Sequence, residues 1–372
     1  MQLLRLDTKQ IKIGTPLPFN VRDEGGHLLL ACGQVVASEA QLQGLMARGM
    51  SADIEEIKTL AAGRKVEAAA HPPNVFARWR HAAWTLDALL KSLDQAEFPA
   101  RCDALAKEII ALVSQDCDVA IYMSVRQESS NPRTYGLTHA LHAAALCQMV
   151  ATRLEWTPPR IFSAVRAALT MNLCIVELQG NFAVYGRLSH EQRDELRLHP
   201  EQAEARLRAA GVADEDWLQA VRQHHEHSDG QGYPSGITDV AEMAQLLRLA
   251  DVFLAKISTR ESRPSLGAKE AERQAYAEAP ASNMALALIK EYGVYPPGEL
   301  VALASGEKGV VIRRGATMQT PIIATLTDKK GLPISGGVKR DTALTGFAIV
   351  AMESDKSLVS GLLAERVYGL TS

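Results

Sequence analysis

The chain of 372 residues contains no run of about 18 consecutive apolar residues, the length that a membrane-spanning helix needs. Its first residues lack the long apolar core of a secretory signal peptide. The formal net charge is only -3, which gives no indication of bulk attraction to nucleic acid or to a membrane surface. We therefore expect a cytoplasmic protein with no membrane span and no bulk nucleic-acid partner.

Cysteine is also scarce, since the chain has five and none of them forms a CxxC pair. Most lie in apolar helical patterns, where a buried free thiol is the simplest interpretation. Hydrophobic residues make up 47% and charged residues 22% of the chain, as in ordinary globular proteins. The length predicts either one large core with additions or two to three units.

The hydrophobic pattern changes character along the chain. Residues 1–60 contain short strand-like segments and predict a small β-rich N-terminal domain, and residues 61–130 are interpreted as a linker and a helical segment. Residues 131–293 repeat apolar residues at helical spacing, whereas residues 294–372 contain short apolar β-like pieces. The sequence therefore predicts a mainly α fold, a helical bundle flanked by small β-rich units at both ends.

Several of the ten histidines lie where separate predicted helices could bring them together. His139 and His142 are three residues apart and therefore project from one side of a helix. A lone histidine is more often a core or surface residue than a ligand, so the group is more informative than any one member. Helical bundles assemble internal metal sites from side chains on facing helices. The candidate metal ligands are His139, His199, His224, His225 and Asp251.

The segment 224–236, HHEHSDGQGYPSG, combines a double histidine, an acid and a glycine-rich turn with Tyr-Pro. Its ordinary explanation would be a polar helix end followed by a loop. The string resembles the HHE…DG.GYP.G signature of HD-GYP domains. His139, then His199 before Pro200, then this segment and then Asp251 follow one another in the order of that family. The resemblance covers about residues 131–270.

The resemblance implies an HD-type helical bundle that holds two or three hard metal ions, often iron or manganese, and hydrolyses cyclic di-GMP. The mechanism that the resemblance implies is two-metal cleavage of a phosphodiester, in which a bridging carboxylate holds the two ions together. It also implies that the loop after the double histidine lines the nucleotide pocket, and the basic residues beyond Asp251 could contact a phosphate. Taken singly, each of these basic residues is more simply explained as a solvated side chain at the end of a helix. The candidate ligand-binding residues are Gly230, Gly232, Tyr233, Pro234, Lys256, Arg260 and Arg263.

One departure from the family pattern affects the centre of this site. The His-Asp pair of the family aligns with Met171 and Asn172, and the lysine that usually follows aligns with Ile175. A thioether is a poor replacement for imidazole with these metals, and an amide carries no negative charge. Two divalent ions about 4 Å apart repel each other by roughly 16 kcal/mol at an effective dielectric constant near 20. We therefore regard these three positions as vestigial and name no catalytic residue.

The leading hypothesis is a catalytically impaired HD-GYP protein in bacterial signalling, which acts as a sensor of cyclic di-GMP or as an adaptor for protein partners. One alternative is an active cyclic di-GMP phosphodiesterase with an altered, single-metal centre. Another is a scaffold that binds neither metal nor nucleotide. The corresponding cofactor is one divalent transition metal, iron or manganese, or none.

Overall fold

The computed structural model describes residues 3–6, 11, 13–14, 17, 19–36, 39–47, 49–54, 74–127, 131–258, 266–278, 282–334, 337–353, 356–359 and 363–370. The chain divides into two compact units, Met1–Pro72 and Pro73–Ser372. The four-part division of the sequence remains a prediction. In the described part of the chain, no helix has the length and apolar character that crossing a membrane requires.

The described residues of the N-terminal unit form a small antiparallel sheet and the helix α1, and the strands follow the order β1-β4-β2-β3. Its own hydrophobic core includes Leu17, Val21, Val36 and Met50. The elements are β1 Leu3–Arg5, β2 Val21–Arg22, β3 Leu28–Leu30, α1 Glu39–Ala47 and β4 Ser51–Asp53.

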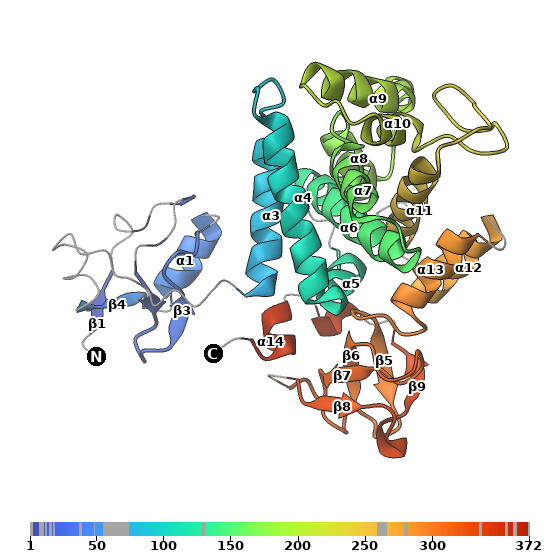
Figure 1. Ribbon diagram of the computed structural model, residues 1–372. Helices are drawn as coiled ribbons and strands as arrows, with labels where there is room; N and C mark the ends of the chain where they lie inside the picture. The colour runs from blue at the N-terminus through green and yellow to red at the C-terminus, as the bar shows by residue number, and fades with distance from the viewer. Residues whose placement is uncertain are drawn as a thin grey trace. The chain divides into compact units, whose positions relative to one another are not determined.

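The larger unit is built around α6, which is buried along most of its length and lies among the other helices (Figure 1). Asn131 caps this helix, because its side chain accepts a hydrogen bond from the backbone N–H of Thr134 at 3.0 Å. The helices are α3 Val75–Leu90, α4 Phe98–Gln115, α5 Cys117–Val125, α6 Pro132–Arg153, α7 Pro158–Thr170, α8 Val176–Tyr185, α9 His190–Ala209, α10 Glu215–Gln223, α11 Glu242–Ile257, α12 Ala268–Glu278 and α13 Asn283–Tyr292.

Two glycines allow α6 and α8 to approach closely. A Cβ atom at Gly136 of α6 would lie 2.3 Å from the carbonyl oxygen of Val176, and one at Gly180 of α8 would lie 1.8 Å from that of Pro132. Neither separation is sterically possible, so both positions require glycine in this packing. The close approach holds the turn between α7 and α8 beside α6, and this turn contains Asn172.

A five-stranded antiparallel sheet follows the helices, with strand order β8-β7-β6-β5-β9. Arg313, the last residue of the central strand β6, pairs with Asp116 just before α5 at 2.7 Å, and the next residue, Arg314, pairs with Asp118 of α5 at 2.5 Å. The chain then ends in short helices. The elements are β5 Leu300–Leu303, β6 Lys308–Arg313, β7 Ile322–Thr325, β8 Lys339–Asp341, η2 Thr345–Phe347, β9 Ile349–Met352, η3 Lys356–Val359 and α14 Ala364–Tyr368.

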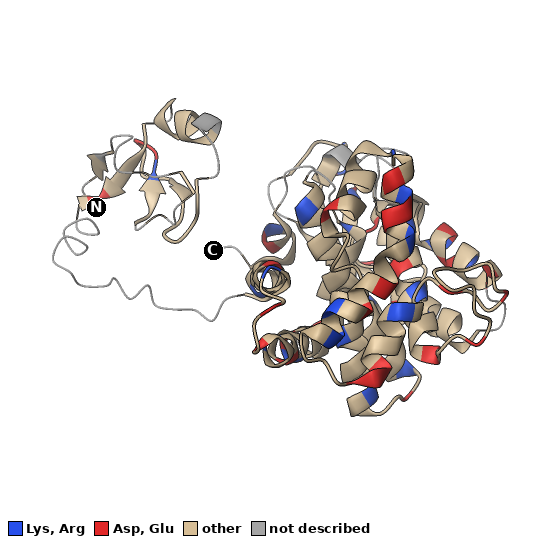
Figure 2. Ribbon diagram, turned by 90° about the horizontal axis from the view of Figure 1, so that it is seen from above, with Lys and Arg blue, Asp and Glu red and all other residues tan. Residues whose placement is uncertain are grey.

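The sheet belongs to the same core as the helices, because Leu300, Val310 and Ile312 join the main hydrophobic cluster. Lysine and arginine are intermixed with aspartate and glutamate along the helices of the larger unit, as seen from above in Figure 2. The predicted fold class is thus confirmed: the chain is mainly helical, with small sheets near both ends.

Candidate metal centre

The five candidate ligands come from different elements and are gathered in the interior of the larger unit. His139 lies on α6, His199 on α9, His224 directly after α10 with His225 next to it, and Asp251 on α11. The side chains of His139, His199 and His224 have no exposed surface, and Asp251 is also buried. They separate into two groups, one of three histidines and one around Asp251.

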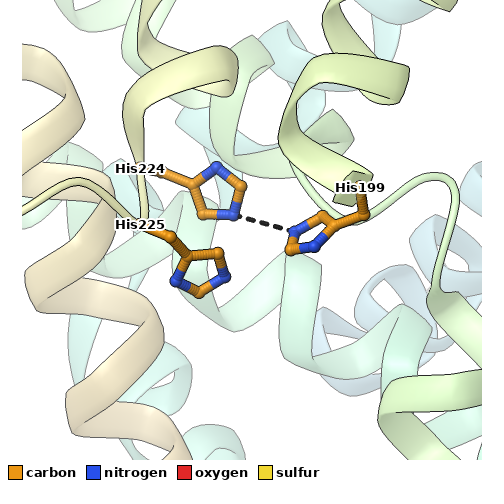
Figure 3. A group of neighbouring side chains, drawn as sticks. All are labelled: His199, His224 and His225. Atoms are coloured by element: carbon orange, nitrogen blue, oxygen red, sulfur yellow. Dashed lines mark hydrogen bonds between the residues drawn. The ribbon is translucent and has the colours of Figure 1, made fainter. Parts of the chain in front are cut away.

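The first group consists of His199, His224 and His225, which point toward one another (Figure 3). One ligand atom of each lies within 4.8 Å of the others, so the three could hold one metal ion. The Nε2 atoms of His199 and His224 are 3.2 Å apart. Metal–nitrogen bonds of about 2.0–2.2 Å place two ligand atoms roughly 3.0–3.5 Å apart, so this separation suits a shared ion.

The tautomers of two of these histidines favour a cation between them. The Nδ1 atoms of His199 and His224 each lie 2.6 Å from a backbone carbonyl oxygen, of Leu196 and Val221 respectively. A carbonyl oxygen only accepts, so both Nδ1 atoms carry the hydrogen. In the neutral rings both Nε2 atoms then present lone pairs to each other, which disfavours direct contact. A metal ion resolves this conflict, and such outer hydrogen bonds are typical of metal-binding histidines.

Burial keeps these rings in the neutral form that binds metal. It lowers the pKa of His199 to about 3. Burial is also the main cause of the lowered pKa values of His224 and His225. The group therefore fits a divalent metal ion in its donor atoms, its tautomers and its protonation state.

The second group is bonded internally. His139 Nε2 lies 2.8 Å from Asp251 Oδ1, and the amide nitrogen of Asn172 donates to the same oxygen at 3.4 Å. Burial raises the pKa of Asp251, but the hydrogen bond and positive charge of His139 outweigh it and leave the pKa below its ordinary value. In the described part of the chain, His139 Nδ1 and Asn172 Oδ1 are buried and find no partner. The ligand atoms that would face a second ion thus contact one another.

The three positions that depart from the family pattern have different surroundings. The side-chain amide of Asn172 donates to Asp251, so this position lies beside one of the candidate ligands. Met171 is fully buried and belongs to the main hydrophobic core, and Ile175 is buried at the start of α8. His142 shares α6 with His139 but contacts Gln127 at 3.1 Å instead of this group.

The side chain of Glu226 holds the loop after the double histidine through hydrogen bonds. Its carboxylate accepts hydrogen bonds from the backbone N–H groups of Ser235 at 2.7 Å and Ile237 at 3.2 Å. Gly232 is required, since a Cβ there would lie 2.4 Å from the backbone nitrogen of His227. The sequence pattern identified Glu226 as part of the motif, but only the structure indicates its role in holding the loop.

The same loop places Tyr233 over the histidine group. The Tyr233 ring stacks on His225, with centroids 4.6 Å apart and planes 25° apart. Its backbone N–H donates to the His225 carbonyl oxygen at 3.1 Å. The peptide bond between Tyr233 and Pro234 is cis, and Gly230 has a φ of +76°. Of the loop residues predicted from the sequence, Tyr233 thus lies against the candidate ligand His225, and the predicted contact of the loop with a nucleotide remains a prediction.

The basic residues after Asp251 are placed only in part. Lys256 forms an ion pair with Glu278 of α12 at 2.5 Å. Arg260 and Arg263 lie outside the described residues, so their predicted contact with phosphate remains a prediction. Sequence reasoning did not single out Arg248, which is one turn before Asp251 on α11.

Comparison with known proteins finds a family match in the helical part of the chain. The family model described as an HD domain matches residues 119–278. The resemblance drawn from the segment 224–236 is thereby confirmed at the level of the family, whereas the effect of Met171 and Asn172 remains a prediction.

Similarity to a curated protein covers a longer part of the chain. The cyclic di-GMP phosphodiesterase PA4108 of Pseudomonas aeruginosa is 29% identical over 242 residues, which cover 62% of this chain and 56% of that protein. The chain thus spans little more than half the length of this curated relative. The solved structure of Bd1817, a HDG"Y"P protein from Bdellovibrio bacteriovorus, has a TM-score of 0.49 and 15% identity, and the match covers 78% of this chain and 99% of that one.

Proposed function

We propose that the protein is a catalytically impaired HD-GYP protein in cyclic-dinucleotide signalling, which binds cyclic di-GMP without efficient hydrolysis and holds at most one divalent metal ion. The observation that carries the proposal is that Asn172, a neutral amide, donates to Asp251 beside His139, where the family pattern has an aspartate. In an active two-metal site these side chains would face the ions.

The charge at position 172 supports the loss of the second ion. An amide there cannot offset the repulsion of two divalent ions, roughly 16 kcal/mol at 4 Å and an effective dielectric constant near 20. The Asn172 amide nitrogen also points a donor at the Asp251 carboxylate, where a cation would bind. Two-metal cleavage of a phosphodiester needs both ions, so its rate should fall with the loss of one.

The three-histidine group supports the retention of one ion, for which the family resemblance suggests iron or manganese. When bound, such an ion can polarise a phosphoryl oxygen. His199 and His224 would be held for it by their backbone hydrogen bonds, and Tyr233 would cover one side. The name of the relative PA4108 supports cyclic di-GMP as the ligand.

The test is to measure binding and turnover of cyclic di-GMP in parallel. Calorimetry on purified protein should detect binding. Chromatography with added manganese or iron should show hydrolysis at least a thousandfold slower than by PA4108, which corresponds to about 4 kcal/mol of lost transition-state stabilisation. PA4108 assayed side by side controls for the conditions.

The possible results separate the three hypotheses. Binding without turnover supports the proposal. Turnover close to that of PA4108 contradicts it and favours an active phosphodiesterase with an altered centre. The absence of both binding and turnover contradicts it and favours a scaffold that acts through protein partners.

A further inference from the structure

A second cavity lies beside the HD metal centre and includes none of its five candidate ligands. It has a volume of about 320 Å³ and lies between α11, α12, α13 and the start of the loop after α10. These three helices lie side by side (Figure 1). The volume is at the lower end of the range for small-molecule pockets, about 300–1,000 Å³. It therefore suits a compact ligand.

The cavity wall combines apolar surface with positive charge. Val252 and Phe253 of α11 and Met284 of α13 supply apolar side chains, and Arg248 and Lys256 of α11 supply the cations. Arg248 and Lys256 are eight residues apart with Val252 midway, so all three lie on one face of the helix. Small-molecule sites typically have this composition, with mostly apolar walls and a few polar groups that set orientation.

Arg248 provides the strongest indication of a ligand. Its side chain is half-buried, and within the described part of the chain it forms no hydrogen bond or ion pair. The half-buried Arg166, by contrast, pairs with Asp103 and Asp214. A partly desolvated guanidinium without an anion is unfavourable, and carboxylate or phosphate groups match its fork of donors.

The second cation of the cavity, Lys256, already has an ion-pair partner, but this partner is exposed to solvent. Lys256 pairs with Glu278, whose side chain is 44% exposed, so the pair lies at the solvent edge of the cavity. An incoming anion can take the place of Glu278 as the partner of Lys256. Glu226, which also borders the cavity, is already occupied by two backbone N–H groups of the loop.

We infer that this cavity binds a small organic anion, a carboxylate or phosphate monoester on an apolar body, with Arg248 as its main partner. The inference does not depend on a metal ion or on cyclic di-GMP.

The test uses benzoate and phenyl phosphate as probes, with benzylamine as a cationic control, in calorimetric titrations of the full chain. At least one anion should bind and benzylamine should not. Comparing the two anions shows whether the site prefers a carboxylate or a phosphate. The titration is repeated after treatment with a chelator, because binding to a metal ion at the histidines would be lost and binding in the cavity would be kept.

Three substitutions locate the binding. R248M should weaken it at least tenfold, about 1.4 kcal/mol, and V252W should abolish it by filling the cavity. E278Q should strengthen it, because it releases Lys256 and removes a negative charge. The matched control is R197M. Arg197 and Arg248 both interact electrostatically with Tyr233, but only Arg248 lines the cavity. Thermal unfolding of each variant identifies any that fails to fold. If V252W does not fold, R248M alone is a sufficient test.

Either of two results would overturn the inference. One is that neither anion binds to the chelated protein. The other is that folded R248M binds as tightly as the wild type. Both leave the proposed function intact, which depends on the histidine group, so failure of the two proposals is distinguishable.

Discussion

Replacing Asn172 by aspartate should destabilise the metal-free protein, and the structure gives the size of the effect. The Asn172 amide nitrogen lies 3.4 Å from Asp251 Oδ1. A carboxylate oxygen at that distance would repel Asp251 by roughly 5 kcal/mol at an effective dielectric constant near 20. Proton uptake limits the loss, because holding a carboxyl group of pKa about 3.9 protonated at pH 7 costs about 4 kcal/mol. We therefore expect N172D to lose about 4 kcal/mol of unfolding free energy at pH 7.

The pH dependence of this loss has a definite sign. The new carboxyl group has a raised pKa in the folded state, so the folded protein binds more protons than the unfolded one and the destabilisation grows with pH. It should decrease by about 1.4 kcal/mol for each pH unit below 7 and vanish near pH 4. Asn172→Leu, which removes the hydrogen bond without adding charge, is the control and should show no such pH dependence.

The assay is urea unfolding in chelator from pH 5 to 7, on wild type and both variants. If N172D unfolds with the wild-type free energy at pH 7, position 172 does not face Asp251 and the reasoning is refuted. Adding manganese should reverse the effect, since a cation between the two carboxylates is stabilising. The double variant M171H/N172D should bind more metal than the sum of its single variants, because both positions would complete one site.

Further predictions concern the loop and the basic residues. G232A should shift the loop, because its Cβ would lie 2.4 Å from the backbone nitrogen of His227, and should lower the thermal unfolding temperature and metal affinity together. E226Q should cost about 1.5–3 kcal/mol in urea unfolding, because it weakens two charge-assisted hydrogen bonds, whereas D239N in the same loop should be neutral. Substituting alanine for Arg260 or Arg263 should weaken calorimetric cyclic di-GMP binding by about 1.5–3 kcal/mol, and unchanged affinity in both would exclude them as phosphate contacts.

The fold class and the location of the loop after the double histidine were predictable from local pattern. Helical periodicity indicated the bundle, and the string after His224 identified the loop, because each depends on residues close together in the sequence. The packing of α8 on α6 was not predictable, since it depends on Gly180 meeting the backbone of Pro132, which lies far away in the sequence.

The contacts within the site were also beyond sequence reasoning. His139 and Asp251 were both predicted as ligands, yet the structure has them bonded to each other across 112 positions of the chain. Arg248 was missed because an arginine on a helix is usually solvated, and only the shape of the cavity distinguishes it. Contacts between residues that are far apart in the sequence therefore determine the role of each side chain in the site.

The most direct test of the central claim is the metal content of the wild-type protein, purified without chelator and measured by mass spectrometry per chain. The account predicts at most one tightly bound transition metal, lost on substitution of His199 or His224 by alanine and kept on substitution of Asn172 by leucine. Two or more stoichiometric metal ions per chain would contradict it, because a second ion would then be held beside His139 and Asp251 with a neutral amide, Asn172, in place of a bridging carboxylate.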